Sequence, residues 1–109
     1  MSQRVTVFCS SSNTASPMFF SEIENLARYL SEADVEVVYG GAKVGLMGHL
    51  ADQVLKHNGR VFGVIPEYLN RTEVVHADLT GLTVVDDLLD RKRAMLKGWD
   101  AVIAFPGGV

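Results

Sequence analysis

The stretch VVYGGAKVGLMG, from Val37 to Gly48, decides the fold, because a β-branched run breaks at two glycines and becomes an amphipathic helix with no linker between them. This pattern predicts a strand, a tight turn and a helix start. The junction is expected to leave unpaired backbone N–H groups at the positive end of a helix dipole, and glycines carry no side chain to keep an anion away. We therefore predict a phosphate or carboxylate site at Gly40, Gly41, Gly45 and Gly48.

The spacing of these glycines matches neither of the common nucleotide-binding motifs. It does not follow G-x-G-x-x-G, and it does not follow the Walker A pattern, because Lys43 precedes Gly45 instead of following it. The ligand therefore need not be a dinucleotide or a triphosphate. An alternative stays open, in which two glycines simply end a strand while Gly45 and Gly48 permit close packing of the helix.

Composition limits the classes of function. The chain has 109 residues, of which 48% are hydrophobic, so it is expected to form one domain. Its net charge of −3 gives no sign of a nucleic-acid partner. The single cysteine, Cys9, allows no intrachain disulfide and favours a cytoplasmic location. No apolar run approaches the roughly 18 residues that cross a bilayer, so we expect no membrane partner.

Strand-like segments alternate with amphipathic segments along the chain. We predict strands at residues 4–9, 35–39, 60–65, 82–85 and 101–105, with helices at 17–32, 44–57 and 86–98. Ser16 and Pro17 form a typical helix start. This alternation predicts a Rossmann-like α/β fold, a parallel sheet with helices on both faces. In the strand order 3-2-1-4-5, ligands would bind where the order reverses, between the first and fourth strands.

Unusual residues follow the ends of these predicted strands. Polar residues 10–13 follow the first strand, the paired glycines follow the second, residues 86–92 follow the fourth, and Pro106 to Gly108 follow the fifth. The carboxyl ends of parallel strands share one edge of a sheet, so we expect all four segments to meet in one crevice.

The predicted third helix carries the sharpest clue. Its apolar stripe, Leu88, Met95 and Trp99, is interrupted by Arg91 and Lys92. Burying unpaired charge is costly, so these cations should meet an anion. Alternatively, the two side chains extend past the helix edge or pair with nearby carboxylates, namely Asp86, Asp87 and Asp90. The position at the predicted crevice favours a ligand role for Arg91.

Several spaced motifs together resemble the Lonely Guy (LOG) family of cytokinin riboside 5′-monophosphate phosphoribohydrolases, whose members often carry the older label of possible lysine decarboxylase. The motifs are YGGAKVGLMG, GVIP at 63–66, EVVH at 73–76, VVDDLLDRKRAM at 84–95 and the final PGG. The resemblance implies a Rossmann-like, usually dimeric enzyme without a cofactor. It would cleave the N-glycosidic bond of a nucleoside 5′-monophosphate, such as AMP, and release free base and ribose 5-phosphate.

The resemblance also implies roles for individual residues. Arg91 and Lys92 match the family's Arg-Lys pair, and Pro106, Gly107 and Gly108 match the start of its PGGxGTxxE loop. The glutamate that acts with Arg91 would lie beyond Val109, together with further strands and helices, so we expect a C-terminally incomplete domain with impaired hydrolysis. The sequence departs from the family pattern at Ser10, Ala42, Leu88 and Leu89.

Cleavage of a glycosidic C–N bond builds positive charge on the ribose, which requires a carboxylate for its stabilisation. Arg91 would act in catalysis by orienting the nucleotide, while the glycine turns hold the 5′-phosphate. The expected substrate contacts are Ser10, Gly40, Gly41, Gly45, Met47, Gly48, Arg91, Lys92, Pro106, Gly107 and Gly108.

Other readings of the chain are kept or set aside on chemical grounds. A non-catalytic nucleotide-binding or carrier module stays open as an alternative. A pyridoxal phosphate-dependent decarboxylase is rejected, because it needs a much larger cofactor domain. We expect no metal, since the three histidines, His49, His57 and His76, lack metal-site spacing. Tyr39 and Trp99 are expected to lie in the core.

Overall fold

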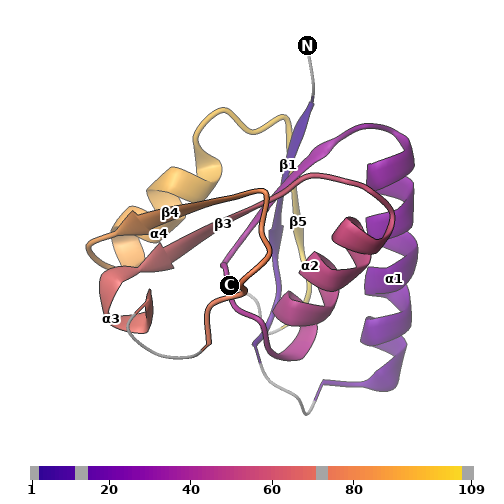
Figure 1. Ribbon diagram of the computed structural model, residues 1–109, viewed down its shortest axis with the longest axis horizontal. Helices are drawn as coiled ribbons and strands as arrows, with labels where there is room; N and C mark the ends of the chain where they lie inside the picture. The colour runs from indigo at the N-terminus through magenta and orange to yellow at the C-terminus, as the bar shows by residue number, and fades with distance from the viewer. Residues whose placement is uncertain (1–2, 12–14, 71–73, 107–109) are drawn as a thin grey trace.

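The computed structural model describes residues 3–11, 15–70 and 74–106 (Figure 1). The elements are β1 (Arg4–Phe8), α1 (Pro17–Glu32), β2 (Glu36–Tyr39), α2 (Gly45–Lys56), β3 (Val61–Pro66), α3 (Glu67–Asn70), β4 (Gly81–Val85), α4 (Leu88–Leu96) and β5 (Ala101–Ala104). The predicted strands and the three longer helices are all present, each within a few residues of its expected bounds. The one-turn helix α3 was not predicted.

All five strands pair in parallel in the order β4-β3-β2-β1-β5, which confirms the Rossmann-like α/β class. The predicted order 3-2-1-4-5 is wrong, because β4 pairs with β3 from Phe62↔Gly81 to Pro66↔Val85. Among its described residues, the connection from β3 to β4 contains no element other than the short α3, and strands joined in this way tend to become neighbours. The order therefore reverses between β1 and β5.

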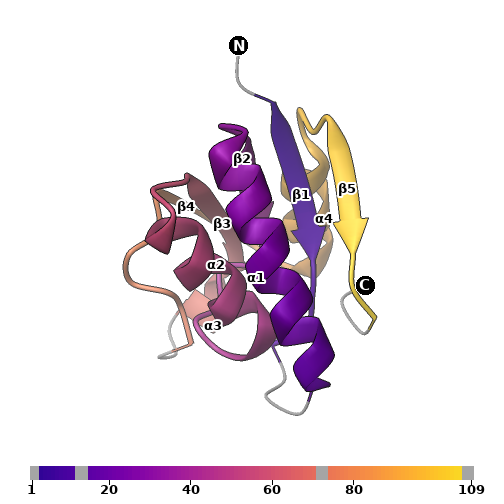
Figure 2. The ribbon, with the colours of Figure 1, turned by 90° about the vertical axis from the view of Figure 1, so that its right-hand side faces the viewer.

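Helices cover both faces of the sheet, as predicted. Figure 2 shows α1 and α2 on one side of the sheet and α4 on the other. The larger core joins the first face to apolar residues such as Ile23 of α1 and Leu50 of α2. The smaller core joins Met95 of α4 to Val38 and Val64 on the opposite face. This layering leaves the carboxyl edge of the strands open for a site.

The start of α1 follows the predicted capping chemistry. Pro17 occupies the first turn, and the side chain of Ser16 accepts a hydrogen bond from the backbone N–H of Met18 at 3.3 Å. Such a cap satisfies one of the donors that a helix start leaves free.

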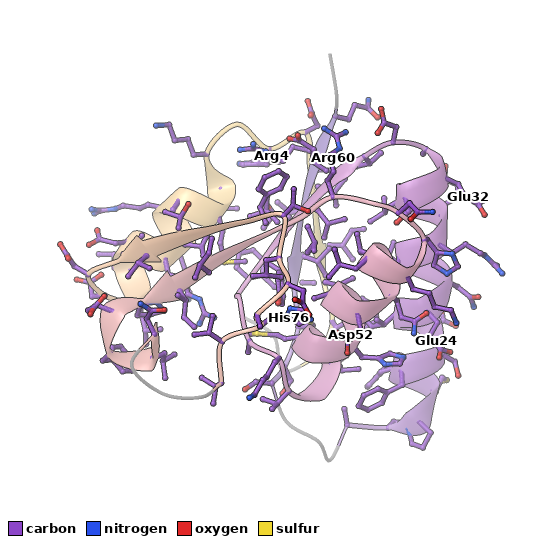
Figure 3. All side chains as sticks on the ribbon, in the orientation of Figure 1. Arg4, Glu24, Glu32, Asp52, Arg60 and His76 are labelled. Atoms are coloured by element: carbon purple, nitrogen blue, oxygen red, sulfur yellow. The ribbon has the colours of Figure 1, made fainter. Side chains whose placement is uncertain are left out.

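Ion pairs clamp the amino edge of the sheet. The Glu36 carboxylate of β2 forms ion pairs with two guanidinium groups. Nη2 of Arg4 in β1 lies 3.3 Å from Oε1, and Nη1 of Arg60, beside β3, lies 2.9 Å from Oε2. Arg60 also reaches the Asp34 carboxylate at 3.0 Å. Arg4 and Arg60 lie together in Figure 3, far from His76 near the opposite edge of the sheet. The charges of this amino edge are therefore paired with one another.

Candidate functional site

A cavity of about 310 Å³ opens at the carboxyl edge of the sheet. It lies among the ends of β1 and β2, the first turn of α2 and one side of α4 from Leu88 to Met95. The lining residues are Val7, Phe8, Cys9, Gly40, Met47, Leu88, Leu89, Arg91, Lys92 and Met95. A smaller cavity of about 140 Å³ lies next to it, and Met47 and Arg91 line both. Arg91 therefore stands between two mostly apolar spaces.

The side chain of Arg91 joins α4 to β3 and to the turn after β2. Its Nε donates a hydrogen bond to the Val64 carbonyl of β3 at 3.0 Å, and its Nη2 donates to the Gly40 carbonyl just after β2. A Cβ at position 40 would lie only 2.4 Å from Nη2. The structure thus brings Arg91 and the first glycine of the pair together, and glycine at position 40 makes room for the guanidinium.

Arg91 has no carboxylate partner among residues 3–11, 15–70 and 74–106. Asp90 pairs instead with Arg93 at 3.8 Å, and the Asp87 carboxylate caps α4 by accepting the Asp90 N–H at 2.8 Å. Burial lowers the pKa of Arg91, while Tyr68 and Tyr39 act in the opposite direction. The guanidinium nevertheless stays charged, because no protein environment deprotonates arginine at neutral pH. A partly buried cation whose hydrogen bonds within the described residues go to carbonyl oxygens favours the approach of an anion.

Lys92 differs from its neighbour in burial. Its side chain is exposed, yet it lines the larger cavity beside Arg91. No carboxylate pairs with it in the part of the chain that the structure describes. Two positive charges consequently face one mostly apolar cavity.

The glycines after β2 are needed for the backbone conformation of the turn, in addition to leaving space for a ligand. Gly41 and Gly45 adopt φ values of +84° and +62°, a left-handed conformation that favours glycine. A Cβ on Gly48 would lie 2.0 Å from the carbonyl oxygen of Lys43, so α2 needs glycine there to approach the turn. The packing alternative is therefore correct for Gly48, and its contact with a ligand stays a prediction.

The start of α2 offers fewer free N–H donors than the sequence predicted. The Met47 N–H donates to the Ser10 carbonyl at 3.1 Å, and the Gly48 N–H donates to the Val44 carbonyl at 3.0 Å. Gly45 also has a partner. The prediction of unpaired N–H groups is wrong for Met47, because the loop after β1 folds its backbone against the helix start, and for Gly48, because its N–H makes the first i→i−4 hydrogen bond of α2 itself. Ser10 consequently contributes a structural carbonyl, and contact between its side chain and substrate stays a prediction.

The predicted apolar stripe of α4 is wrong at two of its three positions. Met95 is buried, but Leu88 and Trp99 are 51% and 47% exposed. The helix ends at Leu96, so Trp99 no longer shares a helical face with Met95. Leu88 stands at the mouth of the cavity instead of in the core.

Other predicted residues fall at the same edge or outside the described chain. The N–H of Phe105 donates to the Phe8 carbonyl at 2.8 Å, which places Pro106 beside the end of β1. Gly107 and Gly108 lie outside the described residues. Tyr39 is buried in the core, as expected, and its hydroxyl donates to the Ala42 carbonyl at 2.9 Å. Cys9 is buried at the cavity wall, and burial raises the pKa of its thiol to about 12.

Sequence reasoning missed two contributions to this site. Val64 supplies a backbone carbonyl, which no side-chain pattern reveals. His76 was considered only as a metal ligand, whereas its ring nitrogen lies 2.7 Å from the Asp52 carboxylate. The EVVH motif was the signal that could have directed attention to His76. Within the described residues, no cluster of three histidine, cysteine or acidic side chains could hold a metal ion.

Comparison with known proteins shows the family. The model of the family described as possible lysine decarboxylase matches residues 47–109. The chain belongs to this family. The resemblance to LOG proteins noted from the sequence motifs is thereby confirmed, and no helix among the described residues is long and apolar enough to cross a membrane.

Two relatives illustrate the similarity within this family. The chain is 43% identical over 106 residues to a cytokinin riboside 5′-monophosphate phosphoribohydrolase from Rhodococcoides fascians, covering 96% of this chain and 54% of the relative. It is 40% identical to the Arabidopsis thaliana phosphoribohydrolase LOG7, with coverage of 97% and 49%. The chain therefore spans about half the length of the curated relatives that it matches.

Solved structures share the fold at low sequence identity. A molybdenum cofactor binding protein from Rippkaea orientalis superposes with a TM-score of 0.81 at 20% identity, covering 95% of this chain and 62% of that protein. This similarity supports the fold alone.

Proposed function

We propose that the protein containing this chain hydrolyses the N-glycosidic bond of a nucleoside 5′-monophosphate, either a cytokinin riboside 5′-monophosphate or AMP. The products would be free base and ribose 5-phosphate. The observation that carries the proposal is Arg91, a partly buried guanidinium without a carboxylate partner in the described chain, at the wall of an apolar cavity. The two relatives at 43% and 40% identity, both named phosphoribohydrolases, supply the reaction class.

The cavity offers different chemistry at its two sides. Leu88, Leu89 and Met47 present apolar surface of the kind that receives a base, while Arg91 and Lys92 attract the anionic part of a nucleotide. In this proposal Arg91 is the catalytic residue that orients the nucleotide. The glycines after β2, the backbone of Ser10 and the Pro106 segment would shape the surrounding walls. No cofactor takes part.

The lining residues of the cavity include no carboxylate within the described chain. An oxocarbenium-like transition state needs one to stabilise its positive charge. The family motif that begins at Pro106 supplies a glutamate for this purpose, so we propose that this glutamate completes the site in the full-length protein. A carrier that only binds nucleotide would not need it.

We also propose a homodimer in the cytoplasm. Four apolar side chains on and after α4 are more than a third exposed, namely Leu88, Leu89, Leu96 and Trp99. An exposed apolar cluster of this kind is typical of a subunit interface. The mass of the native full-length protein in solution tests this part of the proposal.

Turnover of AMP and a cytokinin riboside 5′-monophosphate by the full-length protein tests the reaction, with ribose 5-phosphate as the measured product. Arg91→Ala and Arg91→Lys should each lose most of the activity, because alanine has no cation and lysine lacks the planar fork that reaches Val64 through Nε and Gly40 through Nη2. Arg93→Ala is the matched control on the same helix, since Arg93 is exposed and pairs only with Asp90 among the described residues. A nucleotide-dependent rise in melting temperature without product would contradict hydrolysis and favour the carrier alternative.

A further inference from the structure

His76 is a buried polar residue that the proposed reaction does not use. Its side chain is only 7% exposed, although it lies in the connection between α3 and β4 and lines neither cavity. Burying an imidazole costs free energy unless its nitrogens find partners. Both nitrogens of His76 have one.

The partners of the imidazole fix its orientation. Nδ1 accepts a hydrogen bond from the Asp78 N–H at 3.1 Å, and Nε2 lies 2.7 Å from Oδ1 of Asp52 on α2. Because Nδ1 accepts, the proton belongs on Nε2, which donates to the Asp52 carboxylate. Figure 3 shows His76 and Asp52 side by side where this connection passes α2.

The backbone next to His76 holds the glycine turn after β2. The His76 N–H donates to the Gly41 carbonyl at 3.0 Å, and the Lys43 N–H donates to the Val74 carbonyl at 2.6 Å. An antiparallel bridge joins Ala42 to Val75 between these two bonds. Segment 74–76 therefore behaves as a short extra strand laid along residues 41–43.

The turn that segment 74–76 restrains is also the one whose Gly40 carbonyl binds Arg91. The Gly40 carbonyl, directly before this bridge, accepts from Nη2 of Arg91, while Val64 of β3 accepts from Nε. The Val64 carbonyl sits within the sheet, so its position does not depend on segment 74–76. The Gly40 carbonyl lies in a turn, where the bridge restrains it. Loss of the bridge would consequently release one of the two anchors of the guanidinium.

We infer that His76 is a positioning residue for Arg91, and that the His76–Asp52 hydrogen bond locks segment 74–76 onto the glycine turn so that the Gly40 carbonyl orients the guanidinium. This inference rests on the proposed function for its kinetic consequence, but its structural part stands independently. A misplaced catalytic group lowers turnover more than ground-state binding. Release of the lock should thus lower kcat and leave KM nearly unchanged.

Kinetics of four variants of the full-length protein test the inference. His76→Ala and Asp52→Ala should each lower kcat about tenfold, with KM within about twofold of the wild-type value. Asp52→Asn should keep wild-type kcat, because the amide oxygen of asparagine still accepts from Nε2. His57→Ala is the control, since His57 ends α2 away from both cavities. Equal losses in Asp52→Asn and Asp52→Ala would overturn the hydrogen-bond lock.

A double-mutant comparison separates positioning from general loss of stability. If His76 acts through Arg91, the His76→Ala change should cost little further activity in an Arg91→Ala background. Full additivity of the two losses would overturn the inference. Asp52 is 63% exposed, so Asp52→Ala provides a folded variant for the same comparison if His76→Ala does not fold.

A measurement without substrate keeps this inference distinct from the proposed function. Phenylglyoxal modifies accessible guanidinium groups, and the fraction of modified Arg91 can be followed by peptide mass spectrometry. Modification of Arg91 should be faster in His76→Ala and Asp52→Ala than in Asp52→Asn, His57→Ala or the wild-type protein. Unchanged rates would overturn the positioning role even in an active enzyme. If the wild-type protein shows no hydrolysis but Arg91 is still modified faster in His76→Ala and Asp52→Ala than in the wild-type protein, the positioning role is supported and the hydrolase proposal is refuted.

Discussion

Alanine at position 40 should displace Arg91 with little change to the backbone. The new Cβ would lie 2.4 Å from Nη2 of Arg91 and 2.8 Å from Cε of Met47, whereas ordinary van der Waals contacts begin near 3.4 Å. The guanidinium would have to move by about 1 Å, and a displacement of this size at a catalytic group costs roughly 10²-fold in rate. That loss corresponds to about 2.7 kcal/mol of transition-state stabilisation.

The assay for Gly40→Ala is kcat/KM of the full-length protein for the nucleoside monophosphate, together with its melting temperature. Gly59→Ala is a closely matched control, because its Cβ would lie 2.4 Å from Oγ of Ser31 and 2.8 Å from Cγ1 of Val54, at the far end of α2. Both variants should lose about 1–3 kcal/mol of stability through overpacking, but only Gly40→Ala should lose activity. Wild-type kcat/KM in a folded Gly40→Ala protein would refute the reasoning that the Gly40 contact orients Arg91.

Four further predictions concern residues around the site and at the opposite edge. Tyr39→Phe removes the hydrogen bond to the Ala42 carbonyl and should cost about 1–2 kcal/mol in urea unfolding; an unchanged unfolding midpoint would contradict this. Glu36→Ala breaks the pairs with Arg4 and Arg60 and should lower stability by about 1 kcal/mol, less at high salt, with catalysis unaffected. Rapid labelling of Cys9 by a thiol reagent in the native protein at pH 8 is not expected, because burial raises its pKa to about 12. The same shift should cause stability to fall as the pH rises from about 9 towards 12, since the unfolded thiol ionises first.

The local pattern of the sequence was sufficient for most elements of the fold. Alternation of apolar runs with amphipathic segments located every strand, and the Ser16-Pro17 pair located the start of α1. The strand order needed more information than periodicity contains. Whether β4 joins β1 or β3 depends on the path of the connection between Pro66 and Gly81, and that path is set by contacts such as Ala42↔Val75 between residues far apart in the sequence.

Part of the site could be predicted, because two charged residues stand among apolar ones in the sequence. In the sequence, Arg91 and Lys92 stand between apolar residues of the predicted helix, which directed attention to them, although two of those residues, Leu88 and Trp99, are exposed in the structure. Backbone partners could not be inferred in this way, because carbonyl groups are the same at every residue. The Ser10 carbonyl that occupies the Met47 N–H and the Val64 carbonyl that holds Arg91 both depend on tertiary structure. Contact of the glycine turn with an anion stays a prediction.

The two adjacent cations, Arg91 and Lys92, differ in how firmly the rest of the protein holds their side chains. A guanidinium carries five N–H donors in a rigid fork, and Arg91 gives one to Val64 within β3 and one to the turn after β2. Two anchors on different strands fix the plane of the fork, and its remaining donors find no partner among the described residues. They are therefore available to a ligand in either adjoining cavity. Lys92 is exposed and has no such anchors within the described chain, so it adds positive charge without adding orientation. In the proposed reaction, Arg91 orients the nucleotide, and both Arg91 and Lys92 attract its anionic part.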